Sequence, residues 1–292
     1  MKLWVLCFYV FLRKSVFSQG TQNSTHFDSM NYKLLFPTYR NRFLFIQENL
    51  EKYGRQSFAS ALNLGTGEGD YDPMIAAKCR QLTSCDINEN DIAFAQRLNA
   101  QIPNLQYRIE DALNLSFAEG TFDLLISVDV MEHVGQPERM TGEIARVLRP
   151  DGLAFITFPQ LHFPWTYDPI NRIMGRRAIA QGAYAFGHEY LIDPAVFKKW
   201  AEKYGLEVVE ERNLSGYLVA FAEMYWTGLI QRVFKQNAGN VSGEAQSEGK
   251  LRPSVRQPLL VKLTDVFIRL DLAIFGNARH SVGKGFVVRK KA

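Results

Sequence analysis

The chain has 292 residues, of which 47% are hydrophobic and 22% are charged, and its formal net charge is +4. These values are ordinary for a globular protein with a full core, and they exclude global disorder. Its cysteines, Cys7, Cys79 and Cys85, show neither metal-site spacing nor a disulfide framework, so a reducing compartment is expected. The mild positive charge suits an anionic substrate or an acidic membrane surface, and it gives no basis for nucleic-acid binding.

Residues 1–29 are expected to be an N-terminal extension or a peripheral anchor. Their apolar run, 3–12, is too short to cross a bilayer as a helix. The run resembles a signal-peptide core, but Arg13 and Lys14 follow it where such peptides are normally uncharged. The expected location is therefore the cytoplasm, with membrane association as an alternative.

Short apolar runs then alternate with amphipathic segments along the centre of the chain. A helical lead-in over 30–54, within a lead-in unit of 30–57, comes first. The expected strands are 59–64, 82–85, 106–109, 122–128, 152–158, 206–212 and 285–289. The expected helices are 73–80, 89–100, 137–148 and 194–203, the last with Asp193 as N-cap before Pro194. This alternation predicts a doubly wound α/β domain with ligands at the carboxyl ends of its parallel strands.

A glycine-rich turn follows the first expected strand. Gly65, Gly67 and Gly69 are spaced G-x-G-x-G, and glycine lets a backbone turn sharply and lie close to a ligand. A dinucleotide fingerprint would need its third glycine at position 70, where Asp70 stands. The spacing therefore favours S-adenosylmethionine (SAM), which has no pyrophosphate, over a nicotinamide dinucleotide.

Acidic residues follow the next three strands. Asp86 can accept hydrogen bonds from both ribose hydroxyls of a nucleoside, a device that NAD proteins share, or it is a solvated acid at a strand end. In the run Glu110-Asp111-Ala112, an acid can accept from an adenine amino group while backbone amides contact the ring. Asp129 follows the fourth strand.

The runs LNLGTGEGDYD, SCDIN, EDALNLSF, FDLLISVDVMEHV and RVLRPDGLAFITFP occur in this order over about residues 60–160. Together they resemble the type-11 branch of the class I SAM-dependent methyltransferases, as does the later HEYLIDPAVFKKWAEKYGLEVVEE. The resemblance implies a Rossmann-like seven-stranded sheet whose last strand is antiparallel and lies between strands five and six. Asn63 and Thr66 depart from the family's usual aspartate and common cysteine.

The resemblance also implies the cofactor contacts. The glycines would meet the methionine and ribose of SAM, Asp86 the ribose hydroxyls, Asp111 the adenine and Asp129 the methionine amino group. The full expected set is Asn63, Gly65, Thr66, Gly67, Gly69, Asp86, Ile87, Asp111, Ala112 and Asp129.

Methyl transfer from a sulfonium is an in-line displacement, for which the protein positions the acceptor and excludes water. A hydroxyl acceptor benefits from a general base. His133 is the first candidate, with His162 and His188 as alternatives, although His133 can also serve only to order Glu132 and its loop. Glu132 and His133 are too few ligands to indicate a metal site, so none is expected.

In this fold a short hairpin normally joins strands six and seven, whereas here 216–284 separates a core of 58–215 from a last strand and basic tail, 285–292. Two apolar helices, 218–234 and 259–275, flank a polar stretch expected to be a mobile loop. It runs over 236–257. These helices are interpreted as a lid, as a membrane-docking surface, or as ordinary packing on the core. The aromatic-rich segment 160–190 is expected to be an irregular insertion on the substrate side.

The expected function is transfer of a methyl group to a small or lipid-linked acceptor, at oxygen, with peripheral membrane contact as an option. A nucleic-acid partner is not expected, because no Asp/Asn-Pro-Pro-aromatic motif follows strand four. One alternative is a catalytically silent SAM-fold binding protein. The other is an NAD(P)-dependent reductase, which the glycine spacing and the lack of a Tyr-x-x-x-Lys pair disfavour.

Overall fold

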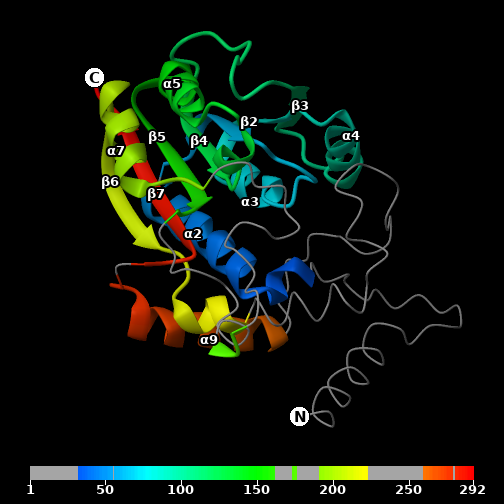
Figure 1. The fold of residues 1–292 in the computed structure, drawn as a ribbon. Helices are drawn as coiled ribbons and strands as arrows, with labels where there is room; N and C mark the ends of the chain where they lie inside the picture. Colours follow the sequence, from blue (N-terminus) through cyan, green and yellow to red (C-terminus); the bar gives the residue numbers. More distant parts are fainter. Residues whose placement is uncertain (1–31, 55, 162–172, 176–190, 223–258, 279) are drawn as a thin grey trace, which may run out of the picture.

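A computed structural model of the protein describes residues 32–54, 56–161, 173–175, 191–222, 259–278 and 280–292. At its centre lies a seven-stranded sheet with the order β3-β2-β1-β4-β5-β7-β6 (Figure 1). The strands are β1 Phe58–Leu64, β2 Cys79–Asp86, β3 Leu105–Ile109, β4 Phe122–Val128, β5 Leu148–Pro159, β6 Leu206–Asn213 and β7 Gly283–Lys290. Strand β7 runs antiparallel to both of its neighbours, β5 and β6, and the pairs among β1 to β5 are parallel. The predicted fold class and the place of the last strand are therefore confirmed.

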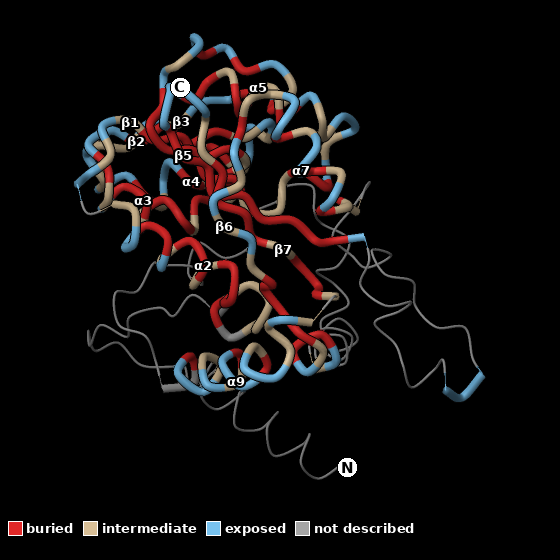
Figure 2. The backbone as a smooth tube through the Cα atoms, turned by 90° about the vertical axis from the view of Figure 1, so that its left-hand side faces the viewer, coloured by how far each residue is buried: buried red, intermediate tan, exposed pale blue. Residues whose placement is uncertain are grey.

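Helices cover both faces of this sheet. The helices of the described residues are η1 Tyr32–Leu35, α2 Pro37–Tyr53, α3 Asp72–Ala76, α4 Glu89–Leu98, η2 Met131–His133, α5 Pro137–Val147, α7 Pro194–Lys203 and α9 Leu259–Phe275. One apolar cluster joins the sheet to α5 and α7, with Ile144 and Phe197 among its members. A second cluster joins the opposite face to α2 and α3 through Ile46 and Ile75. The strands consequently form the buried centre of the molecule (Figure 2).

Most element boundaries follow from local sequence. β4 has the predicted bounds and is buried along nearly its whole length, as expected for a strand covered on both faces. α7 begins after Asp193, whose side chain accepts from the backbone N–H of Ala195 at 2.8 Å, as an N-cap does. The helix predicted over 73–80 was too long. α3 ends at Ala76, because Cys79 already pairs with Phe58 of β1 as the first residue of β2.

The lead-in helix α2 lies between the sheet and α9 (Figure 1). Phe45 and Ile46 pack it on the sheet, and Arg40 joins it to α9. The Arg40 guanidinium, 2% exposed, donates to both carboxylate oxygens of Asp265 at 2.7 and 3.0 Å. The predicted helix over 259–275 is thus confirmed as α9, and it is fixed to the lead-in by a bidentate ion pair.

Residues 217–222, which begin the other predicted apolar helix, are helical. Its remainder, the stretch 236–257 and most of 160–190 lie outside the described residues. Across the described ranges, no helix combines the length and the apolar character that a membrane span requires.

Candidate cofactor and active site

The carboxyl ends of β1, β2, β3 and β4 meet at one edge of the sheet. Strand order reverses between β1 and β4, which is where ligands bind in open α/β sheets. The structure brings the glycine turn, Asp86, Asp111 and Asp129 together at this edge, because each lies at the end of one of these four strands or just after it. We call it the cofactor edge.

The glycine turn has an open centre. Gly65, Gly67 and Gly69 all have positive φ, at 76°, 53° and 80°, a region that glycine adopts without strain. A Cβ atom on Gly65 would overlap the side chain of Val130, and one on Gly69 would lie 2.7 Å from Nδ2 of Asn99. A Cβ on Gly67 would meet no atom within 4 Å. The outer glycines are therefore required by packing, while the middle one leaves room for a ligand against the backbone.

Asp86 shapes the same turn. One of its carboxylate oxygens accepts from the backbone N–H of Gly67 at 2.9 Å, and the other accepts from that of Asn88 at 3.0 Å. Each carboxylate oxygen can accept two hydrogen bonds, so both retain capacity for a ligand hydroxyl. Ile87, the next residue, is 68% exposed and offers an apolar surface beside this carboxylate.

A buried acid that the sequence reasoning missed lies beneath the turn. Asp72 is fully buried and accepts from Nδ2 of Asn63 at 2.7 Å, Oγ1 of Thr66 at 2.9 Å, Oγ of Ser84 at 2.7 Å and the hydroxyl of Tyr107 at 2.7 Å. Burial raises the pKa of Asp72, and its hydrogen-bond donors oppose that shift. The two departures from the family pattern, Asn63 and Thr66, therefore share one partner. Their side chains support the turn from below, and contact with the cofactor remains a prediction for them.

The end of β3 carries two acids with different surroundings. Glu110 is buried and accepts from the N–H of Ser116 at 2.9 Å and from its hydroxyl at 2.5 Å. Asp111 is exposed and accepts from the N–H of Leu113 at 2.8 Å, while Ala112 is buried. Asp111 is thus the acid of this pair that a ligand can reach.

At the end of β4, Asp129 is joined to the lead-in helix. It adopts a positive φ of 52° and accepts from the hydroxyl of Thr157 at 2.8 Å. Its other oxygen forms an ion pair with the buried guanidinium of Arg42. A carboxylate and a guanidinium side by side match the ammonium and carboxylate of an amino acid. Arg42 was missed because a cation in an amphipathic helix usually faces solvent.

Lys33 of η1 binds the glycine turn from outside. Its ammonium lies 2.7 Å from a carboxylate oxygen of Glu68 and 2.5 Å from one of Asp70. Burial favours the neutral amine, but the charges of Asp70 and Glu68 outweigh it and raise the pKa of Lys33 above its usual range. The lead-in therefore holds both sides of the cofactor edge, through Lys33 at the turn and Arg42 at the end of β4.

His133 lies at the end of η2, four residues beyond Asp129, with 38% of its side chain exposed. Its Nε2 is 4.0 Å from a carboxylate oxygen of the buried Glu132. Burial and the charge of Asp129 raise the pKa of Glu132 well above its usual range. His162 and His188 lie outside the described residues. Within those residues, no group of three or more His, Cys, Asp or Glu side chains is arranged to hold a metal.

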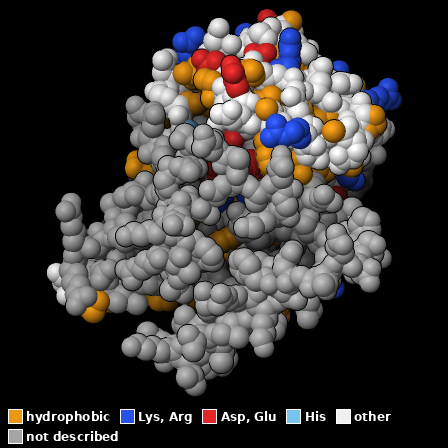
Figure 3. All heavy atoms as spheres, turned by 90° about the vertical axis from the view of Figure 1, so that its right-hand side faces the viewer, with side chains coloured by type: hydrophobic (Ala, Val, Ile, Leu, Met, Phe, Trp, Pro, Cys, Tyr) orange, Lys and Arg blue, Asp and Glu red, His pale blue; other side chains and the backbone are white. Residues whose placement is uncertain are grey.

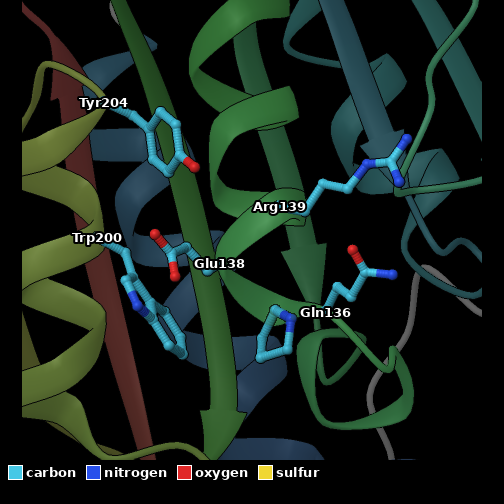
Figure 4. Close-up of a pocket in the computed structure, with 6 residues that line it drawn as sticks. Gln136, Glu138, Arg139, Trp200 and Tyr204 are labelled. Carbon is cyan, nitrogen blue, oxygen red and sulfur yellow. The ribbon is translucent and has the colours of Figure 1, made fainter.

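A pocket lies elsewhere, between α5 and α7 (Figure 4). It has a volume of about 380 Å³ and is lined by Gln136, Pro137, Glu138, Arg139, Trp200 and Tyr204. Trp200 and Tyr204 of α7 face Glu138, and Arg139 points away from them (Figure 4). None of the predicted cofactor residues lines this pocket, so it is separate from the cofactor edge.

Comparison with known proteins identifies a methyltransferase domain in part of the chain. Residues 62–156 match the family model described as a methyltransferase domain, and this segment includes the glycine turn, Asp86, Asp111, Asp129 and His133. A ubiquinone biosynthesis O-methyltransferase of Coxiella burnetii is 23% identical over 171 residues, which are 58% of this chain and 70% of the relative. The biotin biosynthesis bifunctional protein BioHC of Cellvibrio japonicus is 28% identical over 140 residues, 44% of this chain. The chain spans only 28% of the length of that second relative.

The fold is shared with solved methyltransferases. The structure of phosphoethanolamine N-methyltransferase 2 from Haemonchus contortus, in complex with SAM, aligns with a TM-score of 0.52 at 16% identity. The alignment covers 85% of this chain and 52% of the other. The sheet order and the glycine turn agree with this match, and residues 62–156 are a SAM-dependent methyltransferase domain of class I, in its type-11 branch.

Proposed function

We propose that this chain transfers the methyl group of SAM to an oxygen atom of a small or lipid-linked acceptor. The observation that carries the cofactor assignment is the open centre of the glycine turn, where the Gly67 N–H is held by Asp86. SAM would lie along this turn, with Asp86 accepting from its ribose hydroxyls and Asp111 from its adenine amino group. Ile87 and Ala112 would flank the adenine ring. The bound cofactor supplies an electrophilic methyl group.

The Arg42–Asp129 pair would hold the amino-acid end of SAM. Asp129 would accept from the ammonium and Arg42 would donate to the carboxylate, so each exchanges part of its present ion pair for one with the ligand. Such paired recognition fixes the direction of the methyl group, which an in-line displacement requires.

Oxygen is proposed as the methylated atom for two reasons. His133 stands exposed at the cofactor edge, where an imidazole can take the proton of a hydroxyl acceptor as general base. Glu132, 4.0 Å away, can orient the ring. The similar protein from Coxiella burnetii is named as an O-methyltransferase of ubiquinone biosynthesis, which supports oxygen and a lipid-linked acceptor.

The surface and the cysteines of the chain support two further parts of the proposal, namely that nucleic acid is not a partner and that the protein is cytoplasmic. On the face drawn in Figure 3, the visible Lys and Arg side chains are scattered among other types, unlike the dense stripe of a nucleic-acid interface. Cys79 and Cys85 are buried and free, which suits the cytoplasm.

We divide the chain into a lead-in of 30–57, a core of 58–215, an insertion of 216–284 and a last strand with tail, 285–292.

The test is calorimetric titration with S-adenosylhomocysteine and, in parallel, with NADH. Micromolar binding of the first ligand alone supports the proposal, whereas binding of NADH alone favours a reductase. Turnover is then measured with phenolic acceptors, with and without a prenyl chain, and with amines. Binding without turnover of any acceptor favours a silent SAM-fold protein. His133→Ala should lower kcat and leave the affinity for S-adenosylhomocysteine unchanged. His280→Ala, at a half-buried histidine just before β7, is the matched control.

A further inference from the structure

Helix α9 is apolar on two opposite sides. Val261 and Ile268 are buried on the side that faces the rest of the molecule. The opposite side carries large aliphatic residues that are more than half exposed: Leu263 at 59%, Val266 at 63%, Leu270 at 53% and Ile274 at 58%. Their spacing of three or four residues puts them on one face, about 16 Å long at 1.5 Å per residue. We call this face the outer stripe.

The charged side chains of α9 also differ between its inner and outer sides. Asp265 is turned inward to Arg40, and the buried Asp271 accepts two backbone N–H groups at 2.5 and 3.0 Å. Lys262 and Arg269 are exposed and flank the outer stripe on one side. The charges that α9 presents outward are therefore positive, next to an apolar surface. This combination is typical of a helix that lies in the interface of a membrane.

We propose that the outer stripe docks on an anionic bilayer, with the leucine and isoleucine side chains among the acyl chains and Lys262 and Arg269 at the headgroups. Charge complementarity favours this occupant. A second copy of the chain would bring the same cations into the contact, where they would repel each other. The inference deepens the proposed function and rests on it, because it names the surface from which a lipid-linked acceptor would arrive.

The position of α9 relative to the cofactor edge fits such delivery. Arg40 and Arg42, two residues apart on α2, reach Asp265 of α9 and Asp129 of the cofactor edge respectively. One helix, α2, therefore separates α9 from the end of β4. The arrowheads of β5 and β6 in Figure 1 also point toward the side where α9 lies.

The experiment is co-sedimentation of the full chain with vesicles of phosphatidylcholine alone or with phosphatidylglycerol added. The wild-type protein should bind the anionic vesicles. Leu263→Gln/Leu270→Gln should weaken binding by about tenfold or more, because two apolar side chains no longer enter the bilayer. Lys262→Gln and Arg269→Gln should each weaken binding to the anionic vesicles by about fivefold. Added salt should also weaken this binding, because it screens the attraction between these cations and the headgroups. Val209→Gln on β6 and Lys199→Gln on α7 are exposed matched controls and should bind as the wild type does.

Three measurements on these variants, of vesicle binding, light scattering and Tm, test the proposal. Failure of the wild-type protein to bind anionic vesicles, or equal binding by the leucine variant, would overturn the proposal. A wild-type dimer in light scattering that the leucine variant abolishes, without vesicle binding, would assign the outer stripe to a second copy. A large fall in Tm for that variant would show the stripe covered by the chain itself. Titration of each variant with S-adenosylhomocysteine separates this proposal from the proposed function, because none of the substituted residues of α9 lies at the cofactor edge.

Discussion

Removing the carboxylate beneath the glycine turn should destabilise the fold and loosen the cofactor site together. In Asp72→Ala the donors on Asn63, Thr66, Ser84 and Tyr107 lose a shared acceptor. A buried unsatisfied group costs about 1–3 kcal/mol, so four of them set a range of about 4–12 kcal/mol. Water entering the vacated space relieves part of this cost, and we expect a loss near the lower bound, about 4 kcal/mol. At roughly 2–4 °C per kcal/mol, Tm should fall by roughly 10 °C.

The assay is thermal unfolding followed by circular dichroism, with calorimetric titration of S-adenosylhomocysteine well below the transition. Asp72→Asn, which keeps one acceptor oxygen, should lie between the wild type and Asp72→Ala in both measurements. Glu207→Ala, at an exposed position on β6, is the control and should unfold with the wild type. A Tm for Asp72→Ala within about 2 °C of the wild type would refute the view that this network supports the turn.

Three further substitutions test other parts of the site. The raised pKa of Glu132 means that the folded state keeps a proton that the unfolded state loses above about pH 4.5, so stability should fall as pH rises through that window. Glu132→Gln should remove this slope when Tm is measured from pH 4.5 to 8, and an unchanged slope would assign it to another group. Asp265→Asn leaves the Arg40 guanidinium buried against a neutral amide. The free energy of unfolding, measured by urea denaturation, should therefore fall by about 2–4 kcal/mol. No change would mean that α9 is held by apolar packing alone. In Gly65→Ala, a Cβ at positive φ would overlap Val130, so binding of S-adenosylhomocysteine should weaken by about 1–3 kcal/mol. The added substitution Val130→Ala should restore part of that affinity. Full affinity in the single variant would contradict the requirement for glycine in this left-handed turn.

The sheet was predictable because its strands are short apolar runs with clear ends. β4 has the predicted bounds, and the glycine spacing located the turn that follows β1. The local sequence pattern was less informative where strand pairing decides the structure. It placed Cys79 near the end of a helix, whereas Cys79 pairs with Phe58 of β1 as the first residue of β2. The place of β7 came from the family resemblance, since no local pattern specifies a neighbour.

The network around Asp72 could not be predicted, for a related reason. An acid before Pro73 is typical of a helix start, and nothing nearby indicates that it is buried. Its burial results from polar side chains on β1, β2 and β3, which are distant in sequence and converge only when the sheet forms. Arg42 presents the same difficulty, because its partner Asp129 lies 87 residues along the chain, from 42 to 129. The candidate residues were therefore recognisable by motif, whereas their supports were not.

The lead-in helix has a consequence for what counts as a minimal cofactor-binding unit. The segment that matches the family model, 62–156, carries Glu68, Asp70 and Asp129. Their ion-pair partners, Lys33 and Arg42, lie outside it. Cut out alone, this segment would leave these carboxylates without those two cations at the edge where we propose that SAM binds. The motif thus supplies acids whose partner cations come from the segment before it, and a transplant of the motif into another protein should include both η1 and α2.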